Sequence, residues 1–191
     1  MDELFADGGV IRKLWIGEAE KHREHLLRLD ADSRRNRFGV ALADEVIATY
    51  SATAMRTGTI MHGFLLDGIL RGVAELKPFG ATFAREAEIA FSIETPWQSH
   101  GVGSVLLERT LLAARNRGIK RVQMACLAEN ARMQQLARKF AAELSFDLGG
   151  VVGEVAAPHA TPLSIYREWV ADSHGFASAA LDVQARLLRP V

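Results

Sequence analysis

The feature that most limits the fold of this chain is a pair of β-prone runs separated by only two residues. Residues 60–66 and 69–76 are rich in apolar side chains and flank Asp67-Gly68. An Asp-Gly pair in this position is typical of a two-residue turn that joins neighbouring strands as an antiparallel hairpin. A third β-prone run, residues 86–94, follows the Lys77-Pro78-Phe79-Gly80 turn. The sequence therefore predicts three successive antiparallel strands in the middle of the chain.

The segments on either side of these strands predict helices and further strands. Upstream we expect a strand at residues 10–17, a helix at 18–30 and a second helix whose apolar face carries Leu42, Val46, Ile47 and Tyr50. Downstream we expect a four-turn helix from Val102 to Gly118, a strand at 122–127, a helix at 131–142, a hairpin at 144–155 turning at Gly149-Gly150, and a helical tail from Thr161 with a break at Ser173 to Gly175. This order predicts an α+β fold, with a mostly antiparallel, twisted sheet of six to seven strands, helices on both faces and a C-terminal helix.

Bulk composition excludes some classes of function. The 191 residues are enough for one domain, and 23 basic residues balance 23 acidic ones, so net charge gives no attraction to nucleic acid or to an anionic membrane. Cys126 is the only cysteine, which rules out an internal disulfide, and we expect it to be a small buried residue. The first nine residues lack the pattern of a secretion signal, and no run approaches the roughly 18 apolar residues of a spanning helix. We therefore expect a cytoplasmic protein, and the sequence is compatible with a homodimer.

The segment from Ile93 to Gly103 joins a strand to a helix and contains the most informative turn. Backbone N–H groups at the start of a helix are unpaired and carry partial positive charge, so they can bind phosphate. Glycines at 101 and 103 would let a ligand approach the backbone closely. A dinucleotide-binding fingerprint would need a third glycine where Leu106 stands, and a P-loop would need Gly-Lys-Ser or Gly-Lys-Thr, which the chain lacks. An ordinary strand-to-helix connection remains the alternative.

The same turn resembles a family motif. Gln98-x-x-Gly101-x-Gly103 is similar to the Gln/Arg-x-x-Gly-x-Gly/Ala motif of the GNAT (GCN5-related N-acetyltransferase) superfamily, and it lies between the expected fourth strand and third helix, as in that family. The run Val122-Gln-Met-Ala-Cys-Leu-Ala-Glu-Asn130 resembles the family's fifth strand with its terminal asparagine. The resemblance is closest over residues 58–140 and looser elsewhere, with 161–191 as a helical C-terminal extension. We expect residues 1–191 to form one GNAT-like domain.

The resemblance implies a site for acetyl-CoA. The backbone at Phe91 and Ile93 would pair with the pantetheine arm of CoA like an added strand. Backbone N–H groups of the turn would hold the pyrophosphate, and these belong to Gln98, Ser99, His100, Gly101, Val102, Gly103 and Ser104. Asn130 would bind the arm or position the helix that follows, a role compatible with an ordinary helix N-cap.

The resemblance also implies a catalytic carboxylate. Glu88, in Ala87-Glu88-Ile89, matches the catalytic glutamate of some GNAT enzymes and would remove a proton from the acceptor amine. Strand alternation places Glu88 on the face opposite Phe91 and Ile93 unless a bulge intervenes, and a plain surface carboxylate is the alternative. A backbone N–H of the same strand would stabilise the oxyanion. Glu94 and His100 are weaker candidates for the base.

One family position departs from the pattern. Many GNAT enzymes carry a tyrosine, which protonates the leaving thiolate, seven residues after the asparagine, but this chain has Ala137 there. Two functions therefore stay open: an acetyl-CoA-dependent N-acetyltransferase acting on a small-molecule or protein amine, or an acetyl-CoA-binding domain without catalysis. No metal is expected, because His22 and His25 lack further ligands at metal-site spacing and are interpreted as surface side chains. The basic run from Arg34 to Arg37 is interpreted as solvated, with contact to CoA phosphates as the alternative.

Overall fold

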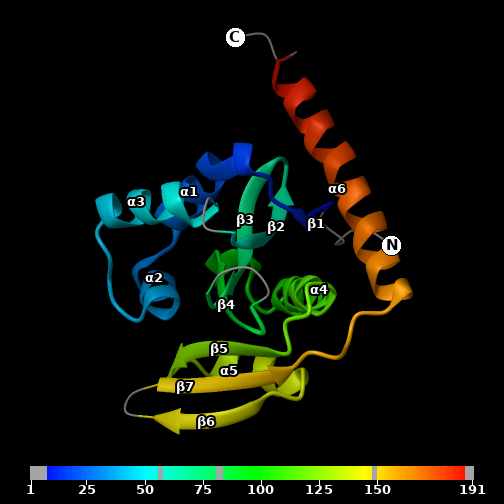
Figure 1. Cartoon of the computed structure of the whole chain (residues 1–191). Coiled ribbons are helices and arrows are strands. Elements are labelled where there is room, and N and C mark those ends of the chain that lie inside the picture. The colour runs from blue at the N-terminus through cyan, green and yellow to red at the C-terminus, as the bar shows by residue number, and fades with distance from the viewer. Residues whose placement is uncertain (1–7, 56–57, 81–83, 148–149, 188–191) are drawn as a thin grey trace.

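The residues that the structure describes form one seven-stranded sheet with helices on both of its faces. This computed structural model describes residues 8–55, 58–80, 84–147 and 150–187, and side chains of 147 and 177–187 are not included in the description. The strands lie in the order β1-β2-β3-β4-β5-β7-β6 (Figure 1). Their bounds are β1 Val10–Lys13, β2 Ile60–Leu66, β3 Ile69–Pro78, β4 Glu86–Ile93, β5 Arg121–Leu127, β6 Glu143–Asp147 and β7 Gly150–Ala156.

The central hairpin has the predicted turn. β2 and β3 pair antiparallel, and Asp67 and Gly68 have φ angles of 52° and 72°. Positive φ at both turn residues is the geometry of a type I′ turn, which Asp-Gly favours. β4 then pairs antiparallel with β3, so the three predicted strands of the middle of the chain are confirmed.

The helices form two layers. α1 (Ala19–Arg28), α2 (Ala31–Phe38) and α3 (Asp44–Ala54) lie on one face of the sheet, and α4 (Val102–Asn116) and α5 (Ala131–Lys139) pack on the other (Figure 1). Side chains alternate along β4, so Ala87 and Ile89 join the core beneath α4 while Ser92 contacts α1. The long helix α6 (Pro162–Leu187) runs along β1 and α4 at one edge. This arrangement confirms the predicted α+β class.

Two expectations about the helices need correction. The run Arg34 to Arg37, expected to be solvated, lies within helix α2, which Asp30 caps by accepting the N–H of Ser33; Arg35 and Asn36 are exposed, but the side chain of Arg37 is buried against Glu75. The break expected at Ser173 to Gly175 does not occur, because α6 is continuous there. A Cβ on Gly175 would lie 3.0 Å from Cβ of Arg12 on β1. The glycine therefore lets the helix pack closely against the sheet instead of ending it.

Several predicted boundaries need smaller corrections. The first strand ends at Lys13, and a short 3-10 helix, Ile16–Glu18, replaces its last part. The expected turn at 77–80 begins later, because β3 continues to Pro78. The turn predicted at Gly149-Gly150 partly lies outside the described residues, although β6 and β7 form the expected hairpin. Among the described residues, no helix is both long and apolar enough to cross a membrane.

Candidate functional site

A cleft opens where two neighbouring strands separate. β4 and β5 pair in parallel only through residues 86–88 and 121–123, and beyond these pairs the strands diverge. The resulting cleft has a volume of about 990 Å³. Its walls come from α2, the later part of β4, the turn before α4, the end of β5 and helix α5. Residues from five separate segments thus meet at one site.

The edge of β4 that faces this cleft carries backbone groups without a partner strand. The N–H of Glu94 bonds to the carbonyl of Arg71 on β3. Because N–H groups alternate between the two edges of a strand, those of Phe91 and Ile93 point away from β3 and toward β5. β5 has already diverged at this level, so both N–H groups border the cleft. An extended ligand could pair with this edge as an added strand.

The turn at residues 98–104 ends in the bare N-terminus of a helix. Gly101 is the N-cap of α4, has a φ of 84° and offers no side chain to the N–H groups of the first turn, which contains no acidic residue. Ser99 also has positive φ, at 65°. Of the turn residues, Gln98, Ser99, Gly101, Gly103 and Ser104 line the cleft. The side chain of Val102 is buried in the core, and His100 is exposed and bonds to the carbonyl of Gln98.

Cationic side chains of α5 surround this turn. Arg132 donates to Oε1 of Gln98 at 2.5 Å, and Lys139 donates to Oγ of Ser104 at 3.0 Å. Arg138 lines the same cleft. Nε2 of Gln98 donates to the carbonyl of Ile93 at 2.8 Å, so this side chain ties the end of β4 to α5. Positive charge and helix N–H groups together make this end of the cleft suited to an anion.

The other predicted site residues lie along the cleft. Glu88 lines it and is partly buried, at the last residue of β4 that pairs with β5. The β3–β4 register is regular along its whole length, so no bulge in this pairing turns Glu88 around. Glu88, Phe91 and Ile93 nevertheless share the cleft, because it opens at the strand edge and side chains of both faces border it. Asn130 lines the cleft and caps α5, accepting the N–H of Met133 at 3.1 Å.

The position of the missing tyrosine lies in the core. Ala137 is buried on α5, close to Gly153 of β7.

Cys126 lines the cleft on β5 and is only partly buried, and burial raises the pKa of its thiol. Trp97 packs against Phe64, with ring centroids 5.9 Å apart.

The sequence did not reveal a buried ionic network beside the cleft. Glu75 on β3 is fully buried and accepts hydrogen bonds from Arg37 at 2.6 Å and from Tyr50. His22 contacts the same carboxylate at 3.3 Å. Burial alone would raise the pKa of Glu75, but the charge of Arg37 and the hydrogen bond from His22 hold that pKa far below its ordinary value. The expected surface position of His22 is therefore wrong.

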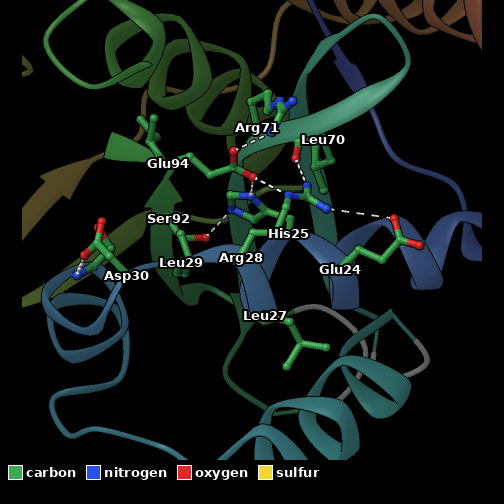
Figure 2. Close-up of polar contacts among 12 residues, drawn as sticks. Glu24, His25, Leu27, Arg28, Leu29, Asp30, Leu70, Arg71, Ser92 and Glu94 are labelled. Carbon is green, nitrogen blue, oxygen red and sulfur yellow. Dashed lines mark hydrogen bonds and ion pairs between the residues drawn. The ribbon is translucent and has the colours of Figure 1, made fainter. Parts of the chain in front are cut away.

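A second buried network joins α1 to the end of β4 (Figure 2). His25, also expected at the surface, is fully buried between Ser92 and Glu94. Arg28 and Arg71 each donate to Glu94 at 2.9 Å. Among the described residues, no group of three or more His, Cys, Asp or Glu side chains has the arrangement of a metal site.

Comparison with known proteins connects this geometry to a family. Residues 50–142 match the sequence profile of the acetyltransferase (GNAT) family. No curated protein matches the chain significantly.

Solved structures share the fold at low sequence identity. The GNAT domain of S. lividans PAT is 24% identical, with a TM-score of 0.69 over 82% of this chain and 96% of its own. The yncA protein of Salmonella typhimurium, solved with its cofactor acetyl-CoA, is 17% identical, with a TM-score of 0.58 over 81% of this chain and 97% of its own. The paia N-acetyltransferase of Thermoplasma acidophilum, in complex with coenzyme A, is 18% identical, with a TM-score of 0.60 over 78% of this chain and 98% of its own. The cleft between β4 and β5 therefore lies in a GNAT fold, and most of its walls belong to residues 50–142, the segment that matches the acetyltransferase (GNAT) family.

Proposed function

We propose that the protein binds acetyl-CoA in the β4–β5 cleft and transfers the acetyl group to a primary amine of a small molecule or protein. The observation that carries this proposal is the alignment of two backbone surfaces along one cleft. The edge of β4 at Phe91 and Ile93 suits an extended pantetheine arm, and the N-terminus of α4 suits a pyrophosphate. Structural relatives solved with acetyl-CoA or CoA support this choice of cofactor.

The chemistry assigns different steps to different groups of the cleft. Glu88 accepts a proton from the amine, which must be neutral to attack the thioester carbonyl. The N–H of Phe91 faces the cleft and stabilises the developing oxyanion. Ala137 supplies no hydroxyl to protonate the leaving thiolate. That absence at the family's position favours a second candidate function, a domain that binds acetyl-CoA without turning it over.

Binding is tested first, with a matched pair of variants at Gly103. A Cβ at this position would meet Ile93 and Leu136 at 3.4 and 3.5 Å, which is ordinary van der Waals contact. Gly103→Ala should therefore bind CoA, whereas the longer side chain of Gly103→Leu should fill the cleft and abolish binding. Isothermal titration calorimetry with CoA measures both. Normal binding by Gly103→Leu would move the cofactor site elsewhere.

Turnover separates the two candidate functions. A panel of primary amines is added to enzyme and acetyl-CoA, and free CoA thiol is detected with Ellman's reagent. A transferase releases thiol in response to one of the amines, and Glu88→Gln slows that release by about 100-fold or more while CoA affinity stays unchanged. A binding domain gives CoA binding with no amine-dependent release by the wild-type protein.

A further inference from the structure

Ser92, His25 and Glu94 are arranged in the order of a catalytic triad (Figure 2). Nε2 of His25 lies 3.0 Å from Oγ of Ser92, and Nδ1 of the same ring lies 3.3 Å from Oε1 of Glu94. A histidine that bridges a hydroxyl and a carboxylate through its two ring nitrogens is the arrangement that activates a serine nucleophile. The three residues come from α1 and from the end of β4, so the fold, not the local sequence, brings them together.

The charges around the triad fix its protonation state. Burial alone would raise the pKa of Glu94, but hydrogen bonds from His25, Arg71 and Arg28 lower it, so the carboxylate is ionised. An ionised carboxylate only accepts hydrogen bonds, so Nδ1 of His25 carries the proton. Burial lowers the pKa of His25, and the ring is therefore neutral with Nε2 free to accept. The hydroxyl of Ser92 donates to Nε2, which leaves its oxygen lone pairs available.

The nucleophile candidate borders the cleft already described. Ser92 lines that cleft on β4, between Phe91 and Ile93, whose N–H groups face the same space. The backbone N–H of the residue after a nucleophilic serine is a common oxyanion donor, and here that residue is Ile93. Nucleophile and oxyanion donors thus border the site that suits a CoA thioester, and the buried base contacts the nucleophile.

We propose that Ser92, His25 and Glu94 act as a catalytic triad that hydrolyses short acyl-CoA thioesters through an acyl-serine. Oγ of Ser92 attacks the thioester carbonyl, its proton passes to Nε2 of His25, the Oγ–C bond forms and the C–S bond breaks. The proton then passes from His25 to the thiolate, which leaves as CoA thiol. Water then attacks the acyl-serine: its oxygen bonds to the acyl carbon while Nε2 of His25 takes one of its protons. The Oγ–C bond breaks, His25 returns the proton to Oγ, and a carboxylic acid leaves.

This activity rests on the proposed CoA site but not on the proposed amine transfer. Glu88 and Ser92 are four residues apart on one strand, so their Cα atoms are separated by about 13 Å. The effect of Glu88→Gln is therefore measured on amine-dependent thiol release. Ser92→Ala should have its effect on the release that occurs without amine.

The test is thiol release from acetyl-CoA with no amine present. The wild-type protein should release CoA thiol, and Ser92→Ala and His25→Gln should each be slower by at least about 100-fold, while calorimetry shows CoA affinity within about two-fold of wild type. Ser145→Ala, on exposed β6, serves as the matched serine control and should hydrolyse like wild type. Ser92→Cys should accumulate one acetyl group, located at position 92 by peptide mass spectrometry.

The outcomes distinguish failure of the triad from failure of the cofactor site. Binding of CoA without amine-independent thiol release in wild type, or equal release by Ser92→Ala, overturns the triad and leaves the proposed transferase in place. Absence of an acetyl group at position 92 in a folded Ser92→Cys protein has the same meaning. Absence of CoA binding by wild type overturns both proposals. A purely structural His25 would change stability without producing an acylated residue.

Discussion

Glu75 is a fully buried carboxylate, and only the side chains that contact it compensate its charge. It is held by Arg37, Tyr50 and His22, and Arg37 itself has only 8% of its side chain exposed. Removing one member of a buried ion pair strands the other charge in a medium that solvates it poorly. The main role of Glu75 is therefore to compensate the buried charge of Arg37 beside the cleft. The net attraction between the two charges matters less for the stability of the fold.

We expect Glu75→Leu to lower the free energy of unfolding by about 3–5 kcal/mol, because the charge of Arg37 would remain buried and unpaired. Tyr50→Phe, which removes the two hydrogen bonds of the phenol, one to Glu75 and one from Arg37, and keeps both charges, should cost only about 1–2 kcal/mol. Urea unfolding followed by circular dichroism measures both variants. The double variant Arg37→Met with Glu75→Leu should recover part of the loss. Equal effects of the two single changes would argue against a buried ion pair.

The sequence predicts some individual residues of the site and misses others, because the partners of the missed residues are distant along the chain. Glu88, Gly103 and Asn130 each lie in a short motif of contiguous residues, and the structure places all three along one cleft. His22, His25 and Arg37 have ordinary helical neighbours in sequence, so their polar character suggests exposure. Their partners Glu75, Ser92 and Glu94 are between 38 and 69 residues away along the chain. Only the packing of α1 and α2 on the sheet brings these charges together.

Helices and strands can be predicted from the sequence where turn or capping residues mark their ends. Asp67-Gly68 fixes a turn and Gly118, with a φ of 74°, follows the end of α4, so both features could be recognised without a structure. Helix α2 is short and mostly polar, and its best local evidence is Asp30 before it and Gly39, with a φ of 76°, after it. The sequence predicts a break in the helix at Gly175, but this residue lies within α6. In the sequence alone, a glycine that permits close packing cannot be distinguished from one that ends a helix.

The contact between β2 and α4 includes a buried histidine that should make stability depend on pH. His62 lies against Thr110 at 3.1 Å, and burial, with smaller effects from the charges of Arg109, Lys13 and Arg117, lowers the pKa of His62 to about 3. In the unfolded chain a histidine has a pKa of about 6.5. Its contribution to stability is therefore fully present above pH 6.5, where neither state binds the proton.

As the pH falls below 6.5, the unfolded chain binds a proton that folded His62 does not, and the free energy of unfolding should fall by about 1 kcal/mol per pH unit. Other buried groups add to the total slope, so the informative quantity is the difference from His62→Gln, which cannot titrate there. Chemical unfolding at several pH values between 6.5 and 4 should give a steeper decline for wild type. Parallel curves for the two proteins would mean that His62 titrates in the folded state.

Across the whole molecule, the cleft follows from a single feature of sheet topology. The strands are antiparallel except for β4 and β5, and this parallel pair separates after three residue pairs. The predicted order of elements is sufficient to indicate a mixed sheet. It does not specify where two neighbouring strands diverge, because that point depends on the twist of the sheet and on how α4 and α5 pack beneath it. The volume of the site therefore had to come from the structure.

The protein as a whole is electrically balanced, yet one end of its cleft is basic. The chain has 23 basic and 23 acidic residues, so net charge does not steer an anion toward it. Arg132, Arg138 and Lys139 all project from α5 around the turn that precedes α4. Attraction of CoA phosphates should consequently be local, and salt should screen it over a Debye length of about 10 Å at 0.1 M.

We expect CoA affinity to weaken several-fold between about 0.05 and 0.5 M NaCl, because the phosphates interact with these exposed cations across water. The double variant Arg138→Ala with Lys139→Ala should bind more weakly at low salt and lose much of the salt dependence, so the two proteins should converge at high salt. Arg167→Ala removes an exposed charge from α6 instead and should follow the wild-type curve. Calorimetry at each salt concentration measures all three. Salt-independent binding by wild type would mean that the backbone N–H groups of the turn account for phosphate recognition without help from α5.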